Sequence, residues 1–576
     1  MIYLWHDPYL NLDRFPLGAV PAGSAVRLRL RVAGESERAF VRLWRGGGEE
    51  WAPMRALSDS AYEADVPVGR EKGLLWYYFV VDTPDGRVYA GKPEDDVCAC
   101  YDHEPPSFQI TVYDPAFEAP EWMRDSVMMQ IMVDRFFIGG KANPPAGRGA
   151  YLHKSWNELP DLRPAAADGD AEAIDFFGGN LEGVREKLSY LKDLGIGAIY
   201  LNPVFRARSN HKYDVGDYLE IDPSFGTEAD FERLTREAAD AGIHVVLDGV
   251  FSHTGADSRY FNRYGTYPSV GAYQSPDSPY AKWYRIDPRT GKYDSWWGID
   301  TLPNVNETEP SFLNFIVNGD DSVIAHYLRS GASGWRLDVA DELPMEFIHA
   351  LRLRAKAEGS QNCVIGEVWE DPTNKVSYGR PRSYALGDTL DSAMNYPLRD
   401  TVLAFFLGRR DAYQLANAVN HQLSTLPKPM LYSMMNLLGS HDKPRAINVL
   451  AGSQNLEPPR EQRAFTPLTP EQYALGSERF VRAFELITLL PGMPCLYYGD
   501  EAGLTGMGDP FCRLPYPWGR EDRALQARIQ SLIRRRNASP ILRRGDTTLR
   551  ALTPDALQIT RTLDGASESF TITRTI

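Results

Sequence analysis

The sequence has little of what marks a membrane-spanning, disulfide-linked or nucleic-acid-binding protein. It contains no run of about 18 apolar residues, so no segment is expected to cross a bilayer. Its five cysteines are an odd, scattered set, which argues against a disulfide framework and favours a reducing compartment. Cys98 and Cys100 lack the spacing and the second pair that a zinc site needs. A net charge of −15 argues against a nucleic-acid partner and against binding to an anionic membrane surface.

The N-terminal stretch also lacks a targeting pattern. The residues "MIYLWHDPYLNLDRF" have no basic start followed by an apolar core, so they are not expected to form a signal peptide. Together with the reduced cysteines, this predicts a cytoplasmic location. The chain of 576 residues is too long for one core, and 43% apolar with 24% charged residues is typical of globular domains.

Aromatic residues are abundant, at 11% of the chain, and many lie in polar stretches such as "KYDSWWGID" (292–300). Rings beside aspartate and glycine suit stacking on flat apolar faces, including those of sugar rings. Packing beneath long loops explains any single ring equally well.

Residues 1–118 have the pattern of a β-sandwich. The stretches "AVRLRLRVAG", "RAFVRLW" and "YEADVPV" alternate apolar and polar residues, and turns rich in Gly, Pro and Asp separate them. Helical periodicity is absent. We expect a separate N-terminal module.

The pattern then changes to alternating strands and helices over residues 119–540. A helix that starts with a capping box from Thr227 to Asp230 leads into one of these strands. Such alternation favours a parallel sheet, and eight units favour a closed (β/α)₈ TIM barrel within a multidomain chain. The eight expected strands lie at 126–133, 197–201, 243–250, 334–339, 363–368, 389–395, 430–438 and 494–499.

Two further regions complete the expected architecture. Residues 251–310, between the third and fourth strands, form a connection long enough to be an inserted subdomain near the barrel mouth. Residues 541–576 alternate again, in stretches such as "ALQITRTL", and have room for about three strands of a short C-terminal β region.

The stretch "GWRLDVADE" (334–342) combines a buried-strand pattern with charged residues. Trp335 and Leu337 alternate with Arg336 and Asp338, which therefore share the other face of the strand. A structural ion pair is one explanation, because a buried aspartate usually needs a partner. The alternative is a functional site at the end of the strand.

Carboxylates at the ends of other strands favour the functional explanation. In a parallel barrel the active site lies at the carboxyl ends of the strands. Each acid alone could be a helix N-cap, but their joint placement is hard to explain structurally. The acids are Asp248, Asp338, Glu367 and Asp442, and His253, His441, Arg336 and Arg445 flank them. Two carboxylates at close range, one ionised and one protonated, are what glycoside hydrolysis requires.

At these residues the chain resembles the α-amylase family, glycoside hydrolase family thirteen. The motifs "DGVFSH", "GWRLDVADE", "GEVW" and "LLGSHD" occur in the family's order, with the accessory stretches "SNHKYDVGDY", "LPNVNE" and "GDEAG". The resemblance covers about residues 125–540. Within the family the chain most resembles the cyclomaltodextrinase, neopullulanase and maltogenic amylase group, on "LDSAMNYPLRD", "SWWGIDTLPNVNE" and the N-terminal sandwich, which would be carbohydrate-binding-like.

The resemblance implies roles for three acids. Asp338 would be the nucleophile that forms a glycosyl-enzyme, and Glu367 the acid and then the base. Asp442 would hold the 2- and 3-hydroxyls of the sugar. In a retaining enzyme of this kind the carboxyl groups of Asp338 and Glu367 lie about 5–5.5 Å apart.

The resemblance also implies a substrate-binding set around the acids. Arg336 would orient Asp338 and keep it ionised, with Asp248 supporting that network. The remaining substrate-binding residues are expected to be Tyr213, His253, His441, Glu342 and Arg445. The target would be the α-1,4, and also the α-1,6, glucosidic bond in maltooligosaccharides, cyclodextrins or pullulan. The resemblance further implies a homodimer through the N-terminal module.

Three departures from the family pattern affect these expectations. The calcium site common in the group should follow the first strand, but "FFIGGKANPP" places Ile138 and Lys141 there, and Asn180 stands where Asp is usual. Calcium prefers several oxygen ligands, so we expect weak or absent calcium and no required cofactor or metal. Lys443 stands where Thr is common. After Asp338 the residues "ADE" (340–342) stand where the group usually has Ala-Asn-Glu. This change affects the side of the site that would receive the acceptor sugar, and with it the bond preference and the level of transglycosylation.

Two other readings remain open at this point. One is a glucosyltransferase or transglycosylase of the same family, which would transfer sugar to sugar rather than to water. The other is a non-catalytic carbohydrate-binding or transporter-partner relative, although such relatives lose the catalytic acids.

Overall fold

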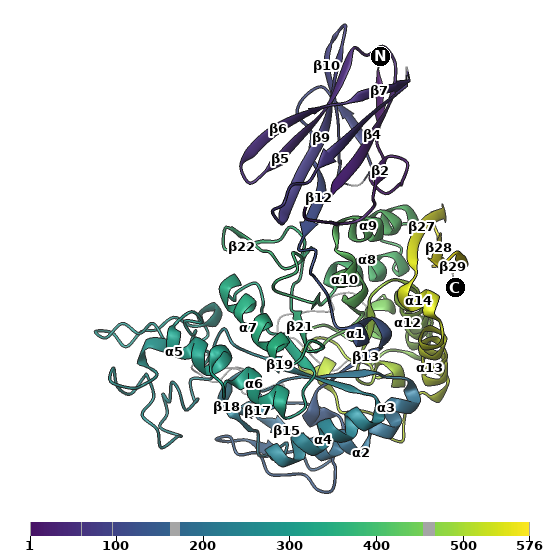
Figure 1. Ribbon diagram of the computed structural model, residues 1–576. Helices are drawn as coiled ribbons and strands as arrows, with labels where there is room; N and C mark the ends of the chain where they lie inside the picture. The colour runs from purple at the N-terminus through teal and green to yellow at the C-terminus, as the bar shows by residue number, and fades with distance from the viewer. Residues whose placement is uncertain (1, 59, 95, 162–172, 453–466, 575–576) are drawn as a thin grey trace.

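The computed structural model describes residues 2–58, 60–94, 96–161, 173–452 and 467–574. The N-terminal part consists of two sheets whose strands are antiparallel except for the parallel pair β3 and β12; they appear in purple at the top of Figure 1. One sheet has the order β1-β4-β8-β7, with β2 beside β4. The other has the order β11-β10-β9-β12-β3, in which β10 and β12 pair with successive halves of one edge of β9. Strand β5 pairs with the opposite edge of β9, and β6 pairs with β5.

Alternation along β4 shows why this module folds as predicted. Val26, Leu28 and Leu30 are fully buried between the sheets, and the arginines between them lie on the other face. The strands are β1 (Tyr3–Trp5), β2 (Arg14–Phe15), β3 (Val20–Pro21), β4 (Ala25–Ala33), β5 (Arg38–Arg45), β6 (Gly48–Pro53), β7 (Arg55–Ser58), β8 (Ala61–Pro67), β9 (Gly73–Thr83), β10 (Gly86–Gly91), β11 (Ala99–Tyr101) and β12 (Phe108–Tyr113).

Eight parallel strands form the central barrel, which confirms the predicted fold class. They are β13 (Met128–Ile131), β16 (Ala198–Leu201), β19 (His244–Gly249), β20 (Gly334–Leu337), β21 (Cys363–Gly366), β24 (Ser392–Ala393), β25 (Met435–Leu437) and β26 (Met493–Tyr497). They pair in chain order, and β26 pairs back with β13. A parallel bridge from Met394 to Met435 brings the ring nearly to closure between β24 and β25.

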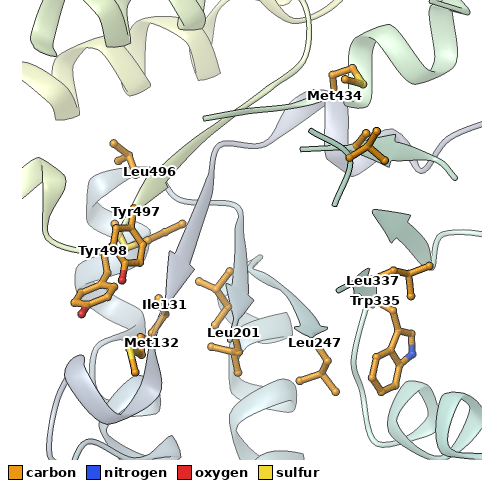
Figure 2. Close-up of a cluster of buried hydrophobic side chains, with 14 of the residues drawn as sticks. Ile131, Met132, Leu201, Leu247, Trp335, Leu337, Met434, Leu496, Tyr497 and Tyr498 are labelled. Carbon is orange, nitrogen blue, oxygen red and sulfur yellow. The ribbon is translucent and has the colours of Figure 1, made fainter. Parts of the chain in front are cut away.

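Apolar side chains on the outer faces of these strands pack against the helices. Figure 2 shows Ile131, Leu201 and Leu247 near the ends of three neighbouring strands, with Trp335 and Leu337 from the fourth. Trp335 and Leu337 are fully buried in this layer. Because strand side chains alternate, Arg336 and Asp338 lie on the inner side, toward the barrel mouth.

The helices surround the barrel (Figure 1) and are α1 (Glu121–Asp125), α2 (Leu181–Glu186), α3 (Leu188–Leu194), α4 (Glu228–Ala241), α5 (Pro310–Leu313), α6 (Val323–Arg329), α7 (Met345–Glu358), α8 (Tyr396–Phe406), α9 (Ala412–Thr425), α10 (Lys428–Ser433), α11 (Ala446–Leu450), α12 (Pro470–Leu489), α13 (Arg523–Ala538) and α14 (Pro540–Arg544). The predicted capping box of α4 is confirmed, with Thr227 and Asp230 bonded reciprocally. Within the described residues, no helix is both long and apolar enough to traverse a bilayer.

Two sequence expectations differ from the structure. The predicted strand 430–438 is a helix in its first half, because Pro427 and Pro429 start α10, and only β25 is extended. The periodic segment after Asn180 is divided into α2 and α3 at Lys187, and it ends at Gly195 as expected.

Loops at the carboxyl ends of the strands carry the short elements β14 (Tyr151–Leu152), β15 (Asp175–Phe176), β17 (Phe205–Ala207), β18 (Val215–Ile221), β22 (Val376–Ser377) and β23 (Arg380–Pro381). The long connection after β19 contains short 3₁₀ turns, including η3 (Trp296–Gly298). An antiparallel bridge from His253 to Asn304 ties this connection to the barrel mouth.

The C-terminal strands β27 (Asp546–Thr553), β28 (Ala556–Leu563) and β29 (Ala566–Thr573) form an antiparallel sheet beside α9, drawn in yellow in Figure 1. Arg561 anchors this sheet to the barrel. Its buried guanidinium donates to the carbonyl oxygens of Leu489 at 2.6 Å and Gly545 at 2.7 Å.

Candidate active site

The predicted acids meet at one end of the barrel. Asp248 lies on β19, Asp338 follows β20, Glu367 follows β21, and Asp442 lies in the loop after β25. Asp338, Glu367 and Asp442 line a cavity of about 640 Å³, together with Tyr213, His253 and His441. Asp248 and Arg336 lie beneath its floor, fully buried.

Arg336 is the centre of the charge network. Its Nη1 donates to Oδ1 of Asp248 at 2.9 Å and to Oδ1 of Asp338 at 2.9 Å. Its Nη2 forms an ion pair with Oε2 of Glu367 at 2.8 Å. One guanidinium therefore contacts three carboxylates from three consecutive strands. The ion pair between Arg336 and Asp338 that the sequence suggested is therefore present, and it lies at the floor of the cavity rather than in a separate core.

Burial and this cation act on Asp338 in opposite directions. Loss of hydration raises the pKa of Asp338 well above its ordinary value, and the nearby Glu367 raises it further, whereas Arg336 lowers it. The sequence interpretation considered only Arg336. Because burial is the larger effect, the pKa of Asp338 lies above rather than below the usual range.

Glu367 is held by two donors from neighbouring residues. Oε2 accepts from the backbone N–H of Val339 at 2.8 Å, and Oε1 accepts from Nε1 of Trp369 at 3.1 Å. Val339 has φ of 38°, which is costly for a β-branched residue and turns its N–H toward Glu367. The Trp369 ring stacks on Tyr396 at a centroid distance of 4.0 Å. Nζ of Lys443 lies 4.6 Å from the same ring.

Tyr213 and His441 form a second hydrogen-bonded group on the cavity wall. Tyr213 Oη donates to Oδ2 of Asp248 at 2.9 Å and lies 2.6 Å from Nε2 of His441. Nδ1 of His441 faces the amide of Gln130 at 2.7 Å. Since that amide nitrogen donates, the proton of His441 is on Nε2, which also lies 3.2 Å from Oδ2 of Asp442.

The two histidines predicted for the site, His253 and His441, are neutral near pH 7. Burial lowers the pKa of His253 to about 4, and burial together with nearby arginines lowers the pKa of His441 well below its usual value. Neutral imidazoles can donate or accept hydrogen bonds to sugar hydroxyls without adding charge.

The structure adds two residues that the sequence interpretation missed. Arg513 lies 3.5 Å from Oδ1 of Asp442 and pairs with Asp509 at 3.0 Å, and both line the cavity. They come from the loop after β26. The charged pattern "DPFCR", a few residues beyond "GDEAG", was the available signal.

Arg445, expected to bind substrate, is fully buried outside the cavity lining. It pairs with Asp500 at 2.9 Å, and its Nε donates to the carbonyl oxygen of Cys512 at 2.8 Å. Its contacts therefore hold the loop that carries Arg513.

The expected acceptor side carries exposed aromatic rings. Trp297 Nε1 donates to Oε1 of Glu342 at 2.8 Å, and Trp297 stacks on Trp296 at 5.4 Å. Trp297 is 76% exposed. Both tryptophans line the cavity rim, whereas Glu342 contacts the rim through Trp297. Burial raises the pKa of Glu342.

In the region where the resemblance implies a calcium site, the side-chain amide of Asn180 is bonded to the backbone. Nδ2 of Asn180 donates to the carbonyl oxygens of Gly139 at 3.0 Å and Lys141 at 3.2 Å. Oδ1 of Asn180 accepts from the N–H groups of Gly139 and Gly183. The carbonyl oxygens of Gly139 and Lys141 therefore each accept a hydrogen bond from this amide. The described residues contain no cluster of three acidic, histidine or cysteine side chains suited to a metal.

Comparison with known proteins places these features in context. A family model described as the alpha-amylase catalytic domain matches residues 161–540. An amylopullulanase of Thermoanaerobacterium saccharolyticum is 35% identical over 98% of this chain and 46% of its own length. A cyclomaltodextrinase of Geobacillus thermopakistaniensis is 34% identical over 76% of this chain and 66% of its own. The chain thus spans less than half the length of the amylopullulanases that it matches.

Solved structures agree with the sequence relatives. A cyclomaltodextrinase superposes with a TM-score of 0.67 at 26% identity, covering 99% of this chain and 90% of that chain. The cyclic α-maltosyl-(1→6)-maltose hydrolase from Arthrobacter globiformis superposes with a TM-score of 0.65 at 30% identity, covering 79% of this chain and 92% of that chain.

Proposed function

The chain belongs to the alpha-amylase family of glycoside hydrolases, and from this premise we propose that it is a retaining hydrolase of α-glucosidic bonds in short α-glucans. The observation that carries the proposal is the contact of one buried arginine, Arg336, with Asp248, Asp338 and Glu367 beneath a cavity. It joins the two carboxylates that a double displacement needs.

In the first step a carboxylate oxygen of Asp338 attacks the anomeric carbon, and Glu367 gives its proton to the glycosidic oxygen. The bond from the anomeric carbon to that oxygen breaks, and the leaving sugar departs as an alcohol. In the second step Glu367 takes a proton from water, whose oxygen attacks the same carbon and releases Asp338. Two inversions at one carbon give net retention.

The charges around the acids suit this sequence. Arg336 lies against both acids and favours the ionised form of Asp338, which the attack on the anomeric carbon requires. Asp442, with His441 and Arg513 beside it, would hold hydroxyls of the sugar.

The printed names of the relatives support the substrate class. Cyclomaltodextrinases, a maltogenic alpha-amylase and a neopullulanase match about three quarters or more of the chain, which favours cyclodextrins, maltooligosaccharides and pullulan. Amylopullulanases match nearly the whole chain, which favours some action on α-1,6 bonds. A homodimer through the N-terminal module stays a prediction of the resemblance.

A second candidate, transfer to a sugar acceptor, rests on the aromatic rim. Trp296 and Trp297 offer stacked rings where an acceptor sugar would enter, and Glu342 fixes Trp297. A non-catalytic role is disfavoured, because all three acids are present and line one cavity.

The test is to incubate the protein with maltotriose, β-cyclodextrin, pullulan and starch and to resolve the products. The Glu367→Gln variant should lower kcat by about 10²–10⁴-fold, the usual contribution of a general acid. Glu370→Gln is a matched control, because Glu370 lies three residues further along the same segment, is 62% exposed and pairs only with Lys375 among the described residues. Full activity in Glu367→Gln, or no hydrolysis of any glucan by the wild type, would refute the proposal. Products longer than the substrate would identify transfer.

A further inference from the structure

Gln130 lies behind the active-site cavity, on the first strand of the barrel. It is fully buried on β13 and is not among the residues that line the cavity. Its side-chain Nε2 lies 2.7 Å from Nδ1 of His441 and donates to Oδ1 of Asn202 at 3.1 Å. Gln130 Oε1 has no hydrogen-bond partner among the described residues, so the contacts from Nε2 hold this amide in place. Gln130 therefore reaches the cavity only through its neighbours.

The direction of these hydrogen bonds follows from Asp248. Its carboxylate is paired with the guanidinium of Arg336 at 2.9 Å, so it accepts hydrogen bonds and donates none. Tyr213 Oη lies 2.9 Å from Oδ2 of Asp248 and uses its one proton on that oxygen. Tyr200 Oη donates to the same oxygen. Because the hydroxyl of Tyr213 has no second proton, other groups bonded to its oxygen must be donors.

Two further groups contact the hydroxyl of Tyr213. Nδ2 of Asn202 lies 3.0 Å from it, and Nε2 of His441 lies 2.6 Å from it, so Nε2 of His441 must have a proton. Burial and nearby arginines lower the pKa of His441 well below its usual value, so the ring has only this proton and Nδ1 has none. Oδ1 of Asn202 and Nδ1 of His441 are then both acceptors, and Gln130 Nε2 supplies one proton to each.

The hydrogen bonds thus run in one direction, from Gln130 through His441 and Tyr213 to Asp248. This direction matters for Asp442, whose Oδ2 lies 3.2 Å from Nε2 of His441. A proton on Nε2 attracts the carboxylate of Asp442, whereas a lone pair there would repel it. Asp442 would hold hydroxyls of the sugar, and such contacts strengthen in the transition state of glycoside hydrolysis.

We propose that Gln130 is a positioning residue for the reaction. Its amide keeps the single proton of His441 on Nε2, and so holds Asp442 and Tyr213 in the arrangement that the reaction needs. The inference rests on the proposed hydrolase function, because the positions of Asp442 and Tyr213 matter only if the cavity cleaves a sugar. It goes beyond that function by giving a task to a residue that does not touch the substrate.

The position of the proton is measured by ¹⁵N NMR of the full chain with labelled histidine, and the His441→Gln variant identifies the signals of His441. In the wild type, Nε2 should be protonated and Nδ1 unprotonated from about pH 5 to pH 8, the range in which ordinary histidines change charge. A proton on Nδ1 of the wild-type ring would overturn the inference. Gln130→Met has a similar length but no donor, so it should give a mixture of both tautomers and lower kcat by at least about tenfold.

Gln130→Glu keeps the shape of the side chain and reverses its hydrogen bonding. Its carboxylate accepts the proton of Nδ1 and raises the pKa of His441. Below the raised pKa the ring has both protons, and Nε2 still donates. Above it the remaining proton stays on Nδ1, and Nε2 becomes an acceptor that faces Asp442. The kcat/KM of this variant should therefore fall, relative to that of the wild type, as the pH rises through the raised pKa.

Loss of folded protein alone would lower the activity without changing the shape of this profile. The other charged and titratable groups that face His441 are unchanged in the variant, and they are Tyr213, His211, Arg336, Asp442, Asp509 and Arg513. A new pH dependence would therefore report the altered partner of Nδ1.

Gln109→Glu is the matched control. Gln109 is 7% exposed on the N-terminal sheet, and its Nε2 likewise makes two hydrogen bonds, to Thr111 at 3.0 Å and to Thr373 at 2.9 Å. Its kcat/KM profile should keep the shape of the wild-type profile. If the wild type hydrolyses maltotriose, an unchanged kcat in Gln130→Met or a Gln130→Glu profile parallel to the wild-type profile overturns this inference alone. Absence of hydrolysis by the wild type refutes the proposed function instead.

Discussion

Replacing Arg336 with lysine should disturb all three carboxylates of the cavity floor at once. The guanidinium fork contacts Asp248 and Asp338 through Nη1 and Glu367 through Nη2, at 2.8–2.9 Å. A single ammonium keeps the charge but cannot reproduce this planar, two-armed arrangement. At least one buried carboxylate then loses its cationic partner.

The expected size of the effect follows from the burial of these groups. Leaving one partner of a buried ion pair uncompensated costs about 3–5 kcal/mol in the free energy of unfolding. Loss of the Arg336 contact also raises the pKa of Asp338 further, because burial already raises it and Arg336 is the main opposing influence. A weakening of that contact by about 1.4 kcal/mol corresponds to one pH unit.

The sign of the pH effect follows from the role proposed for Asp338. The nucleophile must be ionised, so activity is lost as the pH falls through its pKa. A higher pKa moves the acidic limb of the kcat/KM profile to higher pH, by about one unit or more. Arg329→Lys is the control, because Arg329 makes a two-pronged pair with Glu358 at the surface, is 51% exposed, and should alter stability by at most about 1 kcal/mol. An unchanged acidic limb and unchanged unfolding in Arg336→Lys would refute this reasoning.

Three further predictions concern the surroundings of the acids. Chelator should leave activity and Tm unchanged, and a fall in Tm with chelator alone would contradict the structural role given to the Asn180 amide. Asn180→Leu should lower the free energy of unfolding by about 1–3 kcal/mol, because it leaves buried carbonyl and N–H groups unpaired. Trp369→Phe keeps the stacking but removes the N–H bonded to Glu367, and should lower kcat/KM by about tenfold or more with little change in unfolding. Trp297→Ala should lower the ratio of transfer to hydrolysis products of maltotriose by at least about threefold, and an unchanged ratio would remove the rim from the acceptor side.

Much of the barrel could be predicted because its signals are local. Strands buried on both faces are short apolar runs, and the capping box of α4 and the end of α3 at Gly195 are set by residues next to one another. Element boundaries were less predictable. The apolar run "MLYSMMNLL" suits a strand and a helix equally, and the prolines at the start of α10 decide for helix in its first half.

The sequence interpretation named acids at or just after strand ends, whereas it did not name Arg513 and Asp509, which lie in the loop after β26. Asp338 and Glu367 follow strands whose order fixes their positions, so topology alone brings them together. Arg513 comes from a loop whose path depends on the buried contacts of Arg445, and the sequence does not reveal that path. The rise in the pKa of Asp338 was also missed, because burial on all sides is a property of the assembled cavity.

The most direct test of the account is to trap the glycosyl-enzyme. The Glu367→Gln variant, given maltosyl fluoride as a substrate whose leaving group needs no protonation, should accumulate a covalent adduct. Mass spectrometry of its peptides should place the sugar on Asp338, and NMR should show the α-anomer as the first product of the wild-type protein. An adduct on another residue, or release of the β-anomer first, would contradict the central claim.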